Sequence, residues 1–155
     1  MTKHRDHADV KIHPPILLLI HIVVAWLLGR FILLPIVVSS AVRNIGLGLT
    51  GIGFLLGILS LYAFTKARTT LDPHGTVTSI VSSGVYRFTR NPIYLGMVSM
   101  LIGFPLIFGN VWGIPVAPVF ILLMNKLVIE HEEAYLEKKF GEGYTGYKSR
   151  VRRWL

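Results

Sequence analysis

Residues 84–96, GVYRFTRNPIYLG, place polar and aromatic side chains between two strongly apolar stretches. Pro92 suits the first turn of a helix, where its missing N–H leaves no bond unmade, and Asn91 suits the N-cap before it. A helix N-terminus favours a carboxylate or phosphate, and the rings of Tyr86 and Tyr94 could face a cation. The segment therefore predicts a site for a ligand with an anionic end. Capping by Asn91 and an interfacial aromatic belt are the alternatives that need no ligand.

A second polar group, IEHEEAYLEKKFGEGYTGYKSRVRRWL, follows the last apolar stretch from Ile129 onwards. A carboxylate near the hydrocarbon boundary is expensive unless it has a partner. Glu130, Glu133 and Glu137 share one helical face, with Lys126 one turn before Glu130, so surface ion pairing is one explanation for them. The functional alternative is that a carboxylate here holds a cationic or hydroxyl-rich ligand.

Two further motifs are rejected because their surroundings do not suit them. GLGLTG, from Gly46, matches the dinucleotide-binding pattern G-x-G-x-x-G, but it lies inside an apolar stretch with no acidic residue after it. Gly46, Gly53 and Gly57 are instead expected to let helices pack closely. His74 has neither cysteine nor a second histidine nearby, so no metal site is predicted. The roles of His74 and His131 stay open.

Four apolar segments must position these polar groups. They run roughly over residues 12–34, 44–64, 92–108 and 112–129. A membrane-spanning helix needs about 20 residues, so the first two are long enough and the last two form a short helical hairpin. Gly109-Asn110 is the turn signal between them. The hairpin brings residues 90–94 close to residues 130–133, and polar groups that converge at the edge of an apolar bundle indicate a ligand site.

The composition indicates a single membrane-embedded domain, residues 1–155. Hydrophobic residues make up 52% of the chain and charged residues 15%, and the mean hydropathy is +0.58. Soluble domains have about 25% charged residues. The chain has no cysteine, which excludes disulfides and thiolate chemistry.

The Lys and Arg residues predict the topology. Fourteen of the sixteen lie before the first segment, between the second and third, or from the end of the fourth onwards, beginning with Lys126, while Arg30 and Arg43 lie on the opposite side. The positive-inside rule then predicts an all-α integral membrane protein with about four transmembrane helices, both termini cytoplasmic and a cytoplasmic helical tail. The net charge of +8 is thus a topology signal and an attraction to anionic membrane lipids rather than a sign of nucleic-acid binding.

Three segments resemble the isoprenylcysteine carboxyl methyltransferase family: SGVYRFTRNPIYLG from Ser83, the Ile102-Gly103 pair, and EHEEAYLEKKFGEGYTGYKSRV from Glu130. The family signature is L-V-x-x-G-x-Y-x-x-x-R-H-P-x-Y-x-G, followed after a hairpin by a Glu-rich stretch and F-G-x-x-Y-x-x-Y. The related phospholipid methyltransferases share this general plan. The resemblance covers residues 76–151 and implies a multi-pass membrane enzyme whose cofactor is S-adenosylmethionine, with this half of the domain binding the cofactor.

The resemblance also implies the cofactor contacts, position by position. They are Thr78, Ser79, Ile80, Val81, Tyr86, Asn91, Pro92, Ile93, Tyr94 and Glu130. Glu133, in the same polar segment as Glu130, is predicted as a further cofactor contact. Thr78 and Asn91 stand where the eukaryotic enzymes have histidine. Val128 stands where those enzymes place an arginine for the substrate. The resemblance therefore indicates the reaction type, methyl transfer, better than it indicates the methyl acceptor.

Methyl transfer is an in-line displacement at a sulfonium methyl, so the protein must mainly position the nucleophile and exclude water. Arg90 is the predicted catalytic residue, aligning an anionic group, and a topology anchor is its alternative. A carboxylate acceptor needs no base. An amine or thiol would have to lose a proton, and Glu133 or His131 could accept it if either faces the site.

The expected acceptor is a lipophilic small molecule or a prenylated substrate, and a phospholipid or a small hydrophobic amine or thiol is the alternative. A non-enzymatic membrane protein or a small transporter is a second alternative. A transporter needs an ionisable residue in mid-span, and the predicted spans hold only His21 and Arg30 and no acid.

Overall fold

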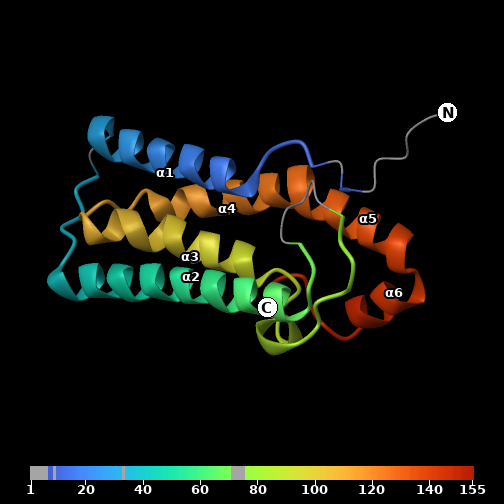
Figure 1. Cartoon of the computed structure of the whole chain (residues 1–155). Helices are drawn as coiled ribbons and strands as arrows, with labels where there is room; N and C mark the ends of the chain where they lie inside the picture. The colour runs from blue at the N-terminus through green and yellow to red at the C-terminus, as the bar shows by residue number, and fades with distance from the viewer. Residues whose placement is uncertain (1–6, 9, 33, 71–75) are drawn as a thin grey trace.

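The computed structural model describes residues 7–8, 10–32, 34–70 and 76–155, and in these ranges the chain forms helices and no strand. His74 lies outside the described residues. The elements in chain order are α1 (Pro14–Phe31), α2 (Ser40–Lys66), η1 (Gly84–Arg87), α3 (Pro92–Ile107), α4 (Gly113–Met124), η2 (Asn125–Ile129), α5 (Glu130–Phe140) and α6 (Glu142–Lys148). Helices α1 to α4 lie side by side, and η1, α5 and α6 gather at one end of this bundle (Figure 1). The predicted all-helical class is confirmed.

Within the described ranges, three helical stretches are long and apolar enough to cross a membrane. They are Pro14–Phe31, Ser40–Lys66 and Gly113–Phe140, with hydropathies of 1.8, 1.9 and 1.6. Helix α3 has 16 residues, about 24 Å at 1.5 Å each, and is the short member of the bundle. The fourth apolar segment is longer than expected, because the single π-helical turn η2 continues α4 directly into α5. The prediction that both helices of the hairpin are short is therefore correct for α3 and wrong for the fourth segment.

Glycines set the close approach of α2 and α3. A Cβ on Gly46 would lie 2.8 Å from the carbonyl oxygen of Gly103, and a Cβ on Gly96 would lie 2.8 Å from that of Gly53. The two glycines on each helix are seven residues, about two turns, apart and so share one face. The predicted packing role is confirmed for Gly46 and Gly53. It is wrong for Gly57, which has open space around its Cα.

The turn between α3 and α4 forms where the sequence predicts it. Gly109 has φ +79°, a left-handed conformation that glycine adopts without strain. Asn110 then donates from Nδ2 to the Ala25 carbonyl at 2.9 Å and accepts from the Trp112 N–H at 2.9 Å. The asparagine thus ties the turn to α1. This turn lies at the end of the bundle opposite the polar segments (Figure 1).

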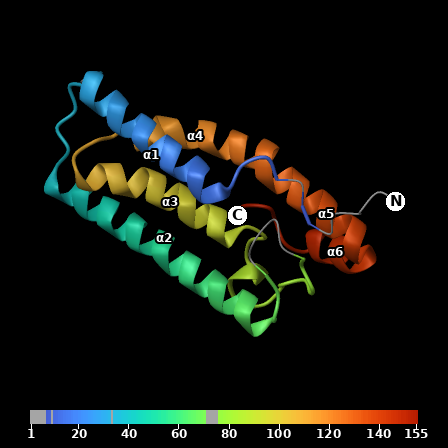
Figure 2. The same ribbon diagram turned by 45° about the horizontal axis from the view of Figure 1, so that its top comes forward.

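The chain turns back on itself after α5. Gly141 has φ +52° and lets α6 begin at once at an angle to α5. Residues 149–155 then return to the start of α3, where the Arg90 N–H donates to the Arg152 carbonyl at 2.9 Å (Figure 2). Segments far apart in the sequence therefore meet at one end of the molecule.

Candidate functional site

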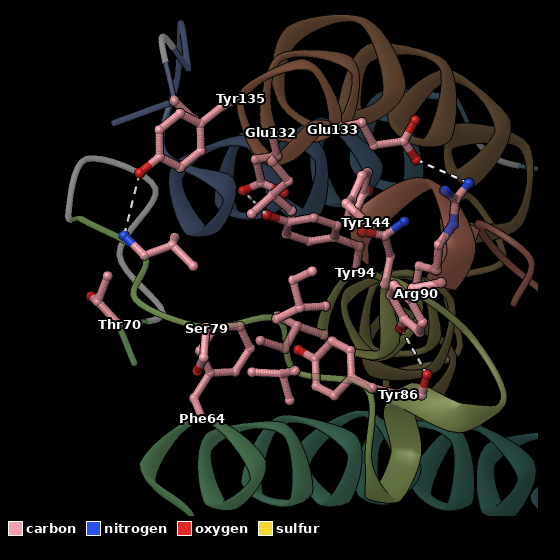
Figure 3. Close-up of a pocket in the computed structure, with 18 residues that line it drawn as sticks. Phe64, Thr70, Ser79, Tyr86, Arg90, Tyr94, Glu132, Glu133, Tyr135 and Tyr144 are labelled. Carbon is pink, nitrogen blue, oxygen red and sulfur yellow. Dashed lines mark hydrogen bonds and ion pairs between the residues drawn. The ribbon is translucent and has the colours of Figure 1, made fainter. Parts of the chain in front are cut away.

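A pocket lies at this end of the bundle, between the end of α2, the loop before η1, the start of α3, and helices α5 and α6 (Figure 3). Its volume of about 120 Å³ is many times the space that one water molecule needs. The lining residues are Ala8, Phe64, Thr70, Val77, Ser79, Ile80, Val81, Tyr86, Arg90, Asn91, Ile93, Tyr94, Glu132, Glu133, Tyr135, Leu136, Tyr144 and Tyr147. Nine of the twelve predicted site residues are among them.

The loop after α2 forms one wall. Thr78 donates from its hydroxyl to the Arg68 carbonyl at 3.0 Å, and Ser79 donates to the Ala67 carbonyl at 3.0 Å, so both side chains tie the loop back to the end of α2. The Val77 N–H donates to the Tyr135 hydroxyl at 3.4 Å, which joins the loop to α5. Ser79 lines the pocket, whereas Thr78 is exposed and does not.

Tyrosines form the floor. The ring of Tyr86 packs edge-on against Phe64, with centroids 5.6 Å apart, and the Tyr147 hydroxyl donates to the Tyr86 carbonyl at 2.7 Å. Burial raises the pKa of Tyr147 to about 12, and it raises the pKa values of Tyr86 and Tyr144 further. All three phenols are therefore neutral near pH 7, so each can donate a hydrogen bond.

Tyr94 and Glu132 meet across the pocket. The Tyr94 hydroxyl donates to Glu132 Oε1 at 2.6 Å, a length typical of a hydrogen bond to a carboxylate (Figure 3). Tyr94 projects from the first turn of α3 and Glu132 from the first turn of α5, 38 residues later. Sequence reasoning predicted Tyr94 but left Glu132 out of the site. The only signal for Glu132 was its place beside Glu133.

Glu133 lies between two guanidinium groups. Arg90 Nη2 is 3.1 Å from Oε1, while Arg153 donates from Nε to Oε1 at 3.0 Å and from Nη2 to Oε2 at 2.7 Å. The side chains of Glu133 and Arg90 are 8% and 9% exposed, so this charge cluster is largely desolvated. The carboxylate raises the pKa of Arg153. Two cations on one anion leave a local charge of +1.

The Arg-Asn-Pro turn has the backbone that the sequence predicts but a different side-chain role. Pro92 occupies the first turn of α3, as expected, and is fully buried behind the pocket rather than in its wall. Asn91 is the N-cap residue, yet its side chain does not cap the helix. The amide instead donates from Nδ2 to the Arg153 carbonyl at 3.0 Å, so the capping explanation for Asn91 is wrong.

Glu130 lies outside this pocket. It forms an ion pair with Lys126 at 2.9 Å, and its side chain is 41% exposed. Glu130 does not line the pocket, and its contact with a cofactor stays a prediction. Val128 is completely buried in the helical core and so cannot meet a substrate from its present orientation. The His131 Nδ1 atom is buried without a hydrogen bond to another described residue, and His131 does not line the pocket.

Sequence reasoning missed much of the aromatic lining. Tyr144 and Tyr147 lie three residues apart on α6, within the F-G-x-x-Y-x-x-Y pattern, and this spacing was the available signal. Phe64 and Tyr135 had no local signal. Phe64 lies near the end of the apolar helix α2, where an aromatic residue is usually part of an interfacial belt, and Tyr135 lies in the middle of the charged helix α5.

The described part of the chain is thus an all-helical protein with membrane-length apolar helices and a polar, tyrosine-lined pocket at one end of its bundle. A family model described as phospholipid methyltransferase matches residues 42–143, about two thirds of the chain. The chain belongs to the phospholipid methyltransferase family. The matched range includes α2 from its third residue, α3, the hairpin and the whole of α5, and so contains most of the pocket. Family and fold together indicate a membrane methyltransferase.

Two relatives match parts of the chain. An uncharacterised protein of Haemophilus influenzae is 43% identical over 63 residues, which are 41% of this chain and all of that protein. Protein-S-isoprenylcysteine O-methyltransferase of Schizosaccharomyces pombe is 29% identical over 72 residues, 46% of this chain and 30% of the yeast protein. The chain therefore covers under a third of the yeast enzyme. No solved structure matches it significantly.

Proposed function

We propose that the protein is an S-adenosylmethionine-dependent methyltransferase that acts on a lipophilic acceptor from the membrane. One observation carries this proposal, in a chain of a methyltransferase family. Glu132 and Glu133 on α5 lie across one pocket from three residues at the start of α3, Arg90, Asn91 and Tyr94. Residues 76–151 would form the cofactor-binding half of a single domain, residues 1–155.

The residues present fit this cofactor. Its amine and sulfonium are cationic, and Glu132 is a carboxylate that accepts a hydrogen bond from a neutral hydroxyl, that of Tyr94. Its carboxylate is anionic, and Arg90 has two buried nitrogens, Nε and Nη1, without a hydrogen bond to a described residue. Buried polar groups nearly always have a partner, so an anionic ligand group would complete this site. The tyrosine walls suit a flat purine.

When bound, S-adenosylmethionine supplies an electrophilic methyl group on a positively charged sulfur. The protein's share is then orientation and the exclusion of water. Arg90, held by Glu133, would align an anionic group, and Glu132, held by Tyr94, would face the cationic end. The buried rings of Tyr86 and Tyr94 would keep water from the reacting centre.

The acceptor would enter from the lipid. A prenylated carboxylate is the acceptor that the yeast relative's name suggests, and it requires a cation. The cation in the described lining is Arg90, which already pairs with Glu133, and Val128 offers none. A phospholipid and a small hydrophobic amine are therefore candidate acceptors beside the prenylated carboxylate. Of these, the family's description favours the phospholipid.

We also propose four membrane crossings with both termini in the cytoplasm. Three helices among the described residues have membrane length, and α3 would cross within the bundle, where it packs against α1, α2 and α4. The uneven distribution of Lys and Arg then places the pocket at the cytoplasmic face, where a soluble cofactor is available.

The proposal is tested with the purified protein in detergent or nanodiscs. Isothermal titration calorimetry should detect S-adenosylmethionine, with S-adenosylhomocysteine competing for the same site. Labelled S-adenosylmethionine, offered with prenylcysteine analogues, phospholipid extracts and hydrophobic amines, should then label one acceptor class. No binding of either ligand at millimolar concentration would overturn the cofactor assignment.

A further inference from the structure

Residues 152–154 cross the start of α3 and bind it through main-chain groups. The Arg90 N–H donates to the Arg152 carbonyl at 2.9 Å. The Arg153 carbonyl accepts from two side chains, the Thr89 hydroxyl at 3.1 Å and the Asn91 amide at 3.0 Å. Three consecutive residues immediately before α3, residues 89–91, are therefore held by this one short segment.

The side chain of Arg153 reaches the other side of the pocket. Its two hydrogen bonds to Glu133, 3.0 and 2.7 Å long, engage both carboxylate oxygens, whereas Arg90 contacts Oε1 at 3.1 Å. A two-point contact fixes the plane of a carboxylate, which a single contact leaves free to rotate. Arg153 itself does not line the pocket, so any effect it has on a ligand must pass through Glu133 or Asn91.

Trp154 anchors the segment from its other side. The indole Nε1 donates to Asn125 Oδ1 at 3.2 Å, and the ring packs against the main apolar core. Asn125 begins the π-helical turn η2, just before α5. The three residues thus join the residues before α3 to the glutamates of α5, which line the pocket on opposite sides, and fix both to the turn η2.

We propose that residues 152–154 are a positioning strap for the pocket and that Arg153 is its positioning residue. Arg153 sets the Glu133 carboxylate with its side chain and the Asn91 amide with its carbonyl oxygen. Because a carbonyl only accepts, the nitrogen of the Asn91 amide must face Arg153, and its oxygen is directed elsewhere. This inference rests on the proposed function, since the ligand it orients is the methyl donor.

The test compares S-adenosylmethionine affinity in the purified full chain. We expect Arg153→Ala to weaken binding about tenfold, the lower end of the range for a lost hydrogen bond to a charged group, because Arg153 acts through another residue. The matched control is Arg152→Ala, which removes the same charge from an exposed side chain and keeps the main-chain bond. Arg152→Ala should bind as the wild type does.

A double-mutant cycle separates positioning from general stability. In a Glu133→Gln background, Arg153→Ala should weaken binding about twofold or less, because the group through which it acts has been changed. Arg153→Lys keeps the charge but not the two-point contact, so it should recover only part of the affinity. Should Arg153→Ala not fold, Arg153→Lys carries the comparison, with a severalfold loss expected.

Each outcome has one meaning. If Arg153→Ala and Arg153→Lys both bind S-adenosylmethionine as tightly as the wild type, the positioning role of residues 152–154 is wrong and the proposed function stands. The same holds if Arg153→Ala lowers the affinity equally in the wild-type and Glu133→Gln backgrounds. No binding by the wild type itself would overturn the proposed function and this inference with it.

Discussion

Glu132 and Glu133 are adjacent in sequence but have different partners. Successive residues of a helix point about 100° apart, so Glu132 reaches the Tyr94 hydroxyl while Glu133 reaches the two arginines. The charge of Glu133 is more than balanced within the protein. Glu132 has a neutral donor, and it is therefore the carboxylate that remains available to a cationic ligand.

At the residue scale, Glu132→Gln should weaken S-adenosylmethionine binding. The change keeps the size and removes the charge that would face the cationic ligand. A lost charge-assisted hydrogen bond corresponds to about 1.5–3 kcal/mol, or roughly ten- to hundredfold in affinity. Calorimetry in detergent measures it.

Two other glutamates are controls for that change. Glu137 pairs with Lys148 at 3.3 Å, and Glu130 pairs with Lys126, both on half-exposed side chains. Since exposed ion pairs contribute little, Glu137→Gln and Glu130→Gln should change the affinity about twofold or less. A large loss in Glu130→Gln with none in Glu132→Gln would instead return the cofactor contact to Glu130.

Tyr94→Phe tests the partner of Glu132. Loss of the hydroxyl leaves a carboxylate oxygen without its donor, and this should lower the free energy of unfolding by about 1–3 kcal/mol. Thermal unfolding in detergent measures the effect. Tyr62→Phe, on a 64% exposed side chain, is the control and should leave the midpoint unchanged. Equal midpoints for all three proteins would show that the Tyr94–Glu132 bond does not contribute to stability.

At the scale of elements, the packing of α2 against α3 depends on the absence of side chains at four positions. A Cβ on Gly103 would lie 2.6 Å from the Gly46 carbonyl oxygen and 2.8 Å from Leu49 Cβ. Backbone cannot move aside as a flexible side chain can. The start of α3 carries Asn91, Ile93 and Tyr94, so a shift of this helix would also move one wall of the pocket.

Gly103→Ala should therefore destabilise the bundle by about 1–3 kcal/mol, the usual effect of overpacking. Gly48→Ala is the matched control, because Gly48 lies on α2 with open space around its Cα. Alanine should leave stability unchanged there or raise it by up to about 1 kcal/mol through its higher helix propensity. Thermal unfolding should rank the proteins Gly48→Ala, wild type and Gly103→Ala, and equal destabilisation by both changes would contradict the close-approach argument.

At the scale of the whole molecule, the membrane topology decides where the pocket opens. The chain has no cysteine, so single cysteines can be introduced without background labelling. Val37 is 95% exposed between α1 and α2, and Ser149 is exposed after α6. With four crossings, Val37→Cys should react with a membrane-impermeant thiol reagent added outside intact cells, and Ser149→Cys should react only after permeabilisation. Labelling of both from the same side would contradict the proposed orientation.

Local properties of the chain were enough to predict the helical class, the Gly109-Asn110 turn and Pro92 in the first turn of α3. Hydropathy, turn residues and a missing N–H act within a few residues of their own position, so a sequence shows them directly. The meeting of residues 90–94 with the glutamates was likewise predicted from the return of the hairpin.

The partners of the side chains depended on the tertiary structure. The predicted face of α5 held Glu130, Glu133 and Glu137. The pocket face holds Glu132, Glu133, Tyr135 and Leu136, and its centre lies about 110° around the helix at 100° per residue. Hydropathy does not specify that rotation when a π-helical turn precedes the helix and charged residues occupy all its sides. Contacts such as that of Asn91 with Arg153, 62 residues apart, form only when packing brings separate segments together.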